Sequence, residues 1–322
     1  MIMSGYTLVN HEGNELGRDE REMFLSFTHD FLCRKDKKIV YRGENDDNLY
    51  AQYQANSSNI GLLSEYLFVL GAKGKAFWDD DTFIKLFDAS KDEVLSSIWI
   101  EIRDLLSCSS DENPHPFKKE DEQDFINKVK KMNPEEQELV INYYYSYLHT
   151  ENSTGSYFLS SSKDLSEAIK FSKSGIVIVG WVPEAESNHQ LIRYTDICSK
   201  HEEIEKLGFT ILVPRYPKEQ EICLKCGILP HFMLGYIVVK ESKFVVNPAV
   251  FETIKSGRCM DDVIGNGLSV SQDDFWDKIK QSGYNKCYRF EKGFFSELSI
   301  VYYKNIILLH KVSASKCGIR QM

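Results

Sequence analysis

Three short segments of the chain carry residue types that could perform chemistry, and each lies near an expected strand end. The first is Tyr41–Arg42–Gly43, the second is Phe158–Ser162 and the third is Tyr216–Glu221. An arginine is always charged and presents forked donors that suit phosphate groups. A carboxylate in a preorganised site can stabilise a positive charge that develops during bond cleavage. The segments therefore supply a candidate phosphate-binding group, several hydroxyls and candidate catalytic carboxylates.

In their order and spacing, these segments resemble the signature of the Arg-Ser-Glu mono-ADP-ribosyltransferases. That signature has a strand that ends in Arg, then a Phe-x-Ser-Thr-Ser strand end, and then a turn that delivers Glu-x-Glu into another strand. The resemblance implies that NAD is a substrate. It implies that Arg42 binds the diphosphate, that Ser160 positions the reacting groups, and that Glu221 stabilises the oxocarbenium ion formed when nicotinamide leaves.

The resemblance implies further roles around this centre. Gly43, Ser162 and Phe171 match positions that help bind NAD: the glycine backbone lies close to the carboxamide, and the aromatic ring lies against nicotinamide. Tyr216 and Glu219 match the turn that recognises the acceptor, and a glutamate at the position of Glu219 favours arginine as the modified group.

Each segment also has a plain structural explanation when it is taken alone. Ser162 could cap the helix expected from Leu165, and the cluster Glu219–Glu221 could be a solvated surface turn. Phe171 could be the core-facing residue of its short helix. The middle serine, Ser161, stands where the family has threonine. The conjunction of the three segments in family order favours the functional interpretation.

The expected activity is transfer of ADP-ribose from NAD to a macromolecular acceptor, which is either protein arginine or a nucleic-acid base. Enzymes of this kind in bacteria are commonly toxins, effectors or phage-defence components, so an antitoxin or a chaperone is an expected protein partner. One alternative is an NAD glycohydrolase, in which water is the acceptor. Another is a degenerate transferase fold that acts by binding alone.

Helical and strand patterns occupy different parts of the chain. Apolar residues recur at three and four positions in the first half, whereas short apolar or alternating runs dominate after residue 153. The predicted fold class is α+β, with a helical block in the N-terminal half. By resemblance the mixed, mainly antiparallel sheet core is split around an NAD cleft. Helices are expected at 20–33, within 61–107 and 120–149, and at 165–171, 250–255 and 273–280; strands are expected at 37–42, 156–160, 176–182, 209–213, 221–224, 232–239, 244–246, 285–290 and within 298–312.

The domain organisation follows from this pattern. Residues 1–250 are expected to form the catalytic domain, with a helical insertion at about 60–150 that explains the long gap between Arg42 and Ser160. Residues 251–322 are expected to be a C-terminal extension of unknown role, and the first polar stretch, through roughly Asp19, is expected to be a loose arm or loop.

Composition excludes several classes of protein. A net charge of −9 gives no global attraction to nucleic acid, and the apolar stretches are too short to span a bilayer. Eight cysteines are scattered along the chain, so we expect reduced thiols. Cys223 and Cys226 are half of a zinc motif without a second pair, so no metal is expected. The first residues do not resemble a signal peptide, which predicts a cytoplasmic protein whose delivery into another cell stays open.

Overall fold

The computed structural model divides the chain into two units that are interleaved in sequence. The first unit takes in Met1–Lys73, Ser160–Arg193 and Gly227–Met322, and the second takes in Gly74–Leu159 and Tyr194–Cys226. The structure describes residues 5–32, 37–53, 55–70, 72–73, 92–107, 122–151, 158–183, 194–195, 198–212, 219–225, 227–228, 232–248, 250, 286–291 and 294–299. Because few residues after 250 are described, the separate C-terminal extension stays a prediction.

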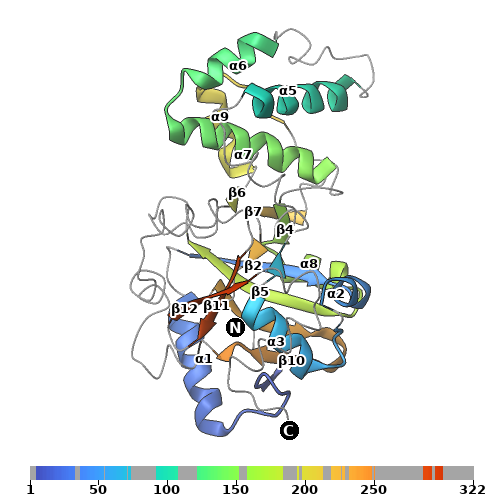
Figure 1. Cartoon of the computed structure of the whole chain (residues 1–322). Helices are drawn as coiled ribbons and strands as arrows, with labels where there is room; N and C mark the ends of the chain where they lie inside the picture. The colour runs from blue at the N-terminus through green and yellow to red at the C-terminus, as the bar shows by residue number, and fades with distance from the viewer. Residues whose placement is uncertain are drawn as a thin grey trace. The chain divides into compact units, whose positions relative to one another are not determined.

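The first unit contains most of the strands (Figure 1). Its elements are β1 (Thr7–Val9), α1 (Arg18–Leu32), β2 (Lys37–Glu44), α2 (Asp46–Tyr53), α3 (Ile60–Leu70), β3 (Ala72–Lys73), the end of β4 (Phe158–Ser162), α8 (Leu165–Ser172), β5 (Ile176–Pro183), β8 (Gly227–Ile228), β9 (Met233–Val238), β10 (Lys243–Val246), β11 (Lys286–Glu291) and β12 (Phe294–Ser299).

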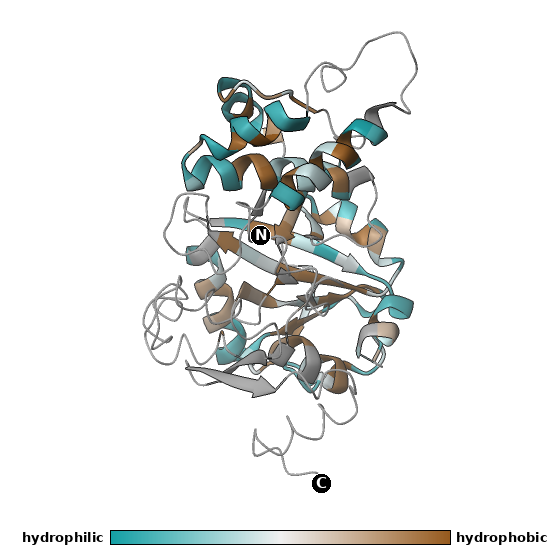
Figure 2. Cartoon of the chain, turned by 45° about the horizontal axis from the view of Figure 1, so that its top comes forward, coloured by the Kyte–Doolittle hydropathy of each residue, from teal (hydrophilic) through white to brown (hydrophobic). Residues whose placement is uncertain are grey.

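The main sheet of this unit is mainly antiparallel, which confirms the α+β class. Its strands run in the order β1-β10-β9-β5-β2-β4, and among the described pairs only β1 with β10 is parallel. β5 has a run of apolar residues because both of its faces are covered, and residues 176–182 are all buried. Much of the ribbon in the sheet is hydrophobic (brown in Figure 2). β2 pairs with β5 from Lys37 to Glu44, and its Tyr41 lies opposite Ser162 of β4.

The second unit is mainly helical. Its elements are α5 (Asp92–Ser107), α6 (Glu122–Lys130), α7 (Pro134–Glu151), β6 (Tyr194–Thr195), α9 (His201–Lys206) and β7 (Glu221–Lys225). Figure 1 shows α5, α6, α7 and α9 gathered together. They pack around one buried core that includes Trp99, Phe125 and Tyr144. At the start of α7, Asn133 accepts a hydrogen bond from the N–H of Glu136, whose carboxylate accepts one from the N–H of Asn133. This capping box fixes the helix start predicted from Asn133–Pro134.

The prediction of a strand at 209–213 is wrong for the described residues, because 209–212 belong to no strand or helix. Side chains of α7 satisfy this backbone instead. The Tyr143 hydroxyl accepts from the N–H of Leu212 at 2.9 Å and donates to its carbonyl at 3.2 Å. The Tyr144 hydroxyl donates to the carbonyl of Thr210 at 3.1 Å. Burial raises the pKa of Tyr143 to about 12, so this hydroxyl keeps its proton at neutral pH.

Replacing Tyr143 by phenylalanine should destabilise the second unit by about 2–3 kcal/mol, because a buried N–H and a buried carbonyl then both lose their partner. Urea unfolding followed by far-ultraviolet circular dichroism would measure the change. Tyr50→Phe is the control, since Tyr50 is 62% exposed and its change should stay within about 0.5 kcal/mol. Equal stability of the two variants would contradict this account of the 209–212 segment.

The expectation of a loose N-terminal arm or loop is wrong for Thr7–Val9. Thr7–Val9 forms β1, which pairs with β10, and Leu8 and Val9 are buried. Burying these two apolar side chains offsets the entropy of ordering a short edge strand. β4 extends to Ser162, two residues beyond the predicted end, and β12 at Phe294–Ser299 overlaps the strand predicted within 298–312 at its first two residues. The rest of these two predicted strands, at 156–157 and 300–312, lies outside the described residues. The helices expected at 250–255 and 273–280 lie outside the described residues, apart from residue 250.

No described helix has the length and apolar character needed to cross a bilayer. In the described part of the chain Cys198 is exposed and Cys223 is buried, and neither forms a disulfide; the redox state of the cysteines stays a prediction.

Candidate functional site

Two of the three candidate segments meet in the sheet of the first unit. Arg42 of β2 donates from Nη1 to the carbonyl oxygen of Ser160 in β4 at 2.6 Å, although the two residues are 118 positions apart. The pairing of Tyr41 with Ser162 places the two strands side by side. The fold therefore brings together the arginine and the serine strand end that the sequence singled out.

Glu44 is part of this site, and sequence analysis missed it. Arg42 Nε donates to Glu44 Oε1 at 2.6 Å, and the side chains are 17% and 4% exposed respectively. Two residues apart on a strand, they share one face of the sheet, which is the signal that could have identified the pair. The pair is neutral overall. A ligand of Arg42 would therefore be bound mainly through the remaining N–H donors of the guanidinium, rather than through a net positive charge.

Gly43 has a structural role that the sequence did not reveal. A Cβ at this position would lie 2.0 Å from the carbonyl oxygen of Ala168 and 2.6 Å from the nitrogen of Ser172, both in the backbone of α8. The absence of a side chain therefore lets α8 pack directly on β2. The proposed close approach of the Gly43 backbone to nicotinamide stays a prediction.

Helix α8 settles two alternatives raised by the sequence. Its N-cap is Asp164, whose carboxylate accepts from the N–H of Ser166 at 2.8 Å, so the interpretation of Ser162 as the cap is wrong. The Ser162 hydroxyl instead accepts from the N–H of Asp164 at 2.9 Å. The interpretation of Phe171 as core-facing is also wrong, because Phe171 is 53% exposed. An apolar side chain on the outer face of α8 is available for a ligand.

The third segment belongs to the second unit. Glu221 is the first residue of β7, and it follows Gln220, whose φ of +48° is left-handed. A non-glycine residue in this conformation costs about 1 kcal/mol and is often found at functional turns. Both Glu219 and Glu221 are partly buried, which argues against a fully solvated charge cluster. Tyr216 lies outside the described residues.

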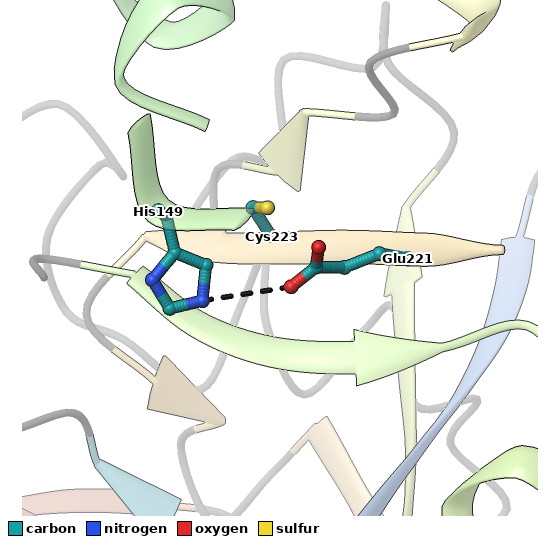
Figure 3. A group of neighbouring side chains, drawn as sticks. All are labelled: His149, Glu221 and Cys223. Carbon is teal, nitrogen blue, oxygen red and sulfur yellow. Dashed lines mark ion pairs between the residues drawn. The ribbon is translucent and has the colours of Figure 1, made fainter. Parts of the chain in front are cut away.

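Two further groups lie beside Glu221 that sequence analysis did not connect with it. His149, in the last turn of α7, places its Nε2 3.5 Å from Glu221 Oε1 (Figure 3). Cys223 follows Glu221 by two residues on β7, and its Sγ lies 4.0 Å from the carbonyl oxygen of Ser146. The imidazole nitrogen, the carboxylate oxygen and the thiol sulfur all lie within 4.8 Å of one another. No sequence motif links His149 to β7, so only the fold could identify this cluster.

No protein-family model, no curated protein and no solved structure matches this chain. The likeness to the Arg-Ser-Glu mono-ADP-ribosyltransferases therefore rests on the residues of the three segments. The geometry of these residues, described above, is the basis for a functional proposal.

Proposed function

We propose that the protein is a mono-ADP-ribosyltransferase that cleaves NAD and transfers ADP-ribose to a macromolecular acceptor. The observation that carries the proposal is the hydrogen bond from Arg42 to the Ser160 carbonyl. It brings the first two segments of the signature into contact. Two segments that matched the signature by chance would have no reason to lie together in the fold.

Arg42 is the residue that would bind the NAD diphosphate. Its Nε and Nη1 are held by Glu44 and by Ser160, which fixes the plane of the guanidinium. Further N–H donors of the same group stay available for phosphate oxygens, and a guanidinium with a fixed orientation loses less entropy when it binds. Ser160 and Ser162 lie at the end of the neighbouring strand and would position the ribose.

Glu221 is the residue that would stabilise the oxocarbenium ion. In the proposed reaction the bond between ribose and nicotinamide breaks, and nicotinamide leaves with the bonding electron pair. The acceptor nucleophile then forms a bond to the same ribose carbon and loses its proton to a base. Glu219, one residue before the left-handed turn at Gln220, is the proposed base and orients an arginine acceptor.

The test is incubation of the purified protein and its Glu221→Gln variant with NAD labelled in the adenylate part, in the presence of a cell lysate. Transfer of label by the wild type and not by the variant supports the proposal. Loss of the labelled product on protease treatment identifies a protein acceptor, and loss on nuclease treatment identifies a nucleic acid. Free ADP-ribose as the sole product would favour the NAD glycohydrolase. If NAD stays intact, the remaining interpretation is the degenerate transferase fold that acts by binding alone.

Phe171→Ser should lower kcat/KM for NAD by about two- to tenfold, because an aromatic contact with the nicotinamide ring contributes about 0.5–1.5 kcal/mol. Stability should change by less than about 0.5 kcal/mol, since Phe171 is an exposed side chain. Steady-state kinetics and thermal unfolding of the same preparation separate the two effects. The matched control is Tyr50→Ser, another exposed aromatic residue of the first unit, which should leave kcat/KM unaltered. Equal kinetics of both variants would rule out Phe171 as a contact of NAD.

A further inference from the structure

The cluster around Glu221 has a composition that NAD cleavage does not require. It combines an imidazole, a carboxylate and a thiol, contributed by His149, Glu221 and Cys223. A thiol and an imidazole have no part in the proposed reaction. Together with a carboxylate oxygen, they are the three kinds of ligand that bind Zn²⁺ in proteins.

The distances suit a tetrahedral cation. Bonds of about 2.0–2.3 Å at tetrahedral angles separate the ligand atoms by about 3.3–3.6 Å. His149 Nε2 and Glu221 Oε1 are already 3.5 Å apart. The longest separation in the cluster is within 4.8 Å, so the remaining adjustment is a shift of about 1 Å. Small rotations of the side chains would achieve that shift.

The elements that present these ligands are regular. Glu221 and Cys223 lie two residues apart on β7, so their side chains project from the same face of the strand. His149 comes from α7, and the contact of the Cys223 thiol with the Ser146 carbonyl joins that helix turn to the strand. Ligands held on a helix and a strand are placed more accurately than ligands on loops.

The burial of the three ligand side chains favours tight binding of a cation that has one coordination position left open. Cys223 is fully buried, and the side chains of His149 and Glu221 are 5% and 16% exposed. A thiolate and an imidazole favour Zn²⁺ over Mg²⁺ and Ca²⁺, which prefer oxygen ligands. Three protein ligands leave a fourth position of a tetrahedral cation to water, which can reach the partly exposed Glu221 carboxylate.

We infer that His149, Glu221 and Cys223 form a binding site for a thiophilic divalent cation such as Zn²⁺. The bound cation withholds the Glu221 carboxylate from catalysis. On binding, the S–H bond of Cys223 breaks, its proton passes to solvent and a metal–sulfur bond forms, with no change in oxidation state. The inhibitory part of this inference rests on the proposed function, whereas cation binding does not.

The binding test uses the metal-stripped full chain, titrated with Zn²⁺ in competition with a chromophoric chelator. The wild type should bind at a site whose affinity falls at least tenfold in Cys223→Ser and in Glu221→Gln. The matched control is Cys198→Ser, a thiol of the same unit outside the cluster, which should bind as the wild type does. Co²⁺ should give a thiolate-to-metal absorption band that disappears in Cys223→Ser. Glu221→Gln keeps the shape of a partly exposed side chain, so it tests the site even if the buried Cys223 variant fails to fold.

The activity test compares the rate of NAD consumption with and without Zn²⁺ for the wild type, Cys198→Ser and Cys223→Ser, so that the ratio is independent of the basal rate. The wild type and Cys198→Ser should be inhibited, and Cys223→Ser should be at least tenfold less sensitive. Zinc binding that depends on Cys223 in a protein without NAD activity would uphold the cation site and overturn the proposed function. Zinc affinity unaltered in both cluster variants would overturn the cation site and leave the transferase proposal standing.

Discussion

Replacing Glu221 by glutamine should reduce the rate of NAD cleavage by about 10²–10³-fold, the loss typical of removing one electrostatic stabiliser of a transition state. The amide has nearly the shape of the carboxylate but no charge, so it cannot stabilise the oxocarbenium ion. The partial exposure of Glu221 at the start of β7 means that the fold tolerates the change. Single-turnover cleavage of labelled NAD measures the rate, and circular dichroism checks the fold.

The matched variant is Glu219→Gln, which changes the other carboxylate of the same turn. Its NAD hydrolysis should persist while transfer to an arginine acceptor falls, because Glu219 is proposed to act on the acceptor. A large loss of NAD cleavage in Glu219→Gln with none in Glu221→Gln would reverse the two roles. If both variants cleave NAD at the wild-type rate, the third segment is not part of the active site.

Elements with a strong apolar pattern were predicted well from the sequence. The continuous apolar run of β5 and the helical spacing in α1, α6 and α7 identified these elements within a few residues. Elements whose stability comes from distant partners were not. β1 is ordered by pairing with β10, and the apolar segment 209–212 is held by the tyrosines of α7 rather than by a neighbouring strand.

The candidate site shows the same division. Sequence motifs identified Arg42 and Ser160, and the structure brings them into contact. Glu44 and His149 were missed because their roles depend on which side chains the fold brings near them. A short motif can indicate the groups that act on a substrate. The side chains that hold those groups in place, or that compete for them, belong to no sequence motif. They can be recognised only from the contacts that they make in the fold.

The largest effect on stability is expected for Gly43→Ala, which should destabilise the first unit by about 3 kcal/mol or more. The added Cβ would meet the Ala168 carbonyl oxygen at 2.0 Å and the Ser172 nitrogen at 2.6 Å. Both atoms belong to the backbone of α8, so no change of rotamer relieves the overlap. The helix must move away from β2, which opens the buried contact between the two elements.

Gly61→Ala is the matched control, because a Cβ at Gly61 meets no atom within 4 Å. Gly61 lies in α3, where alanine is the better helix former, so this variant should be as stable as the wild type or slightly more stable. Urea unfolding of both variants measures the difference. If Gly43→Ala keeps wild-type stability but loses NAD binding, the glycine serves the ligand rather than the packing of α8. If stability and NAD binding fall together, the displacement of α8 explains both, because that helix also carries Phe171.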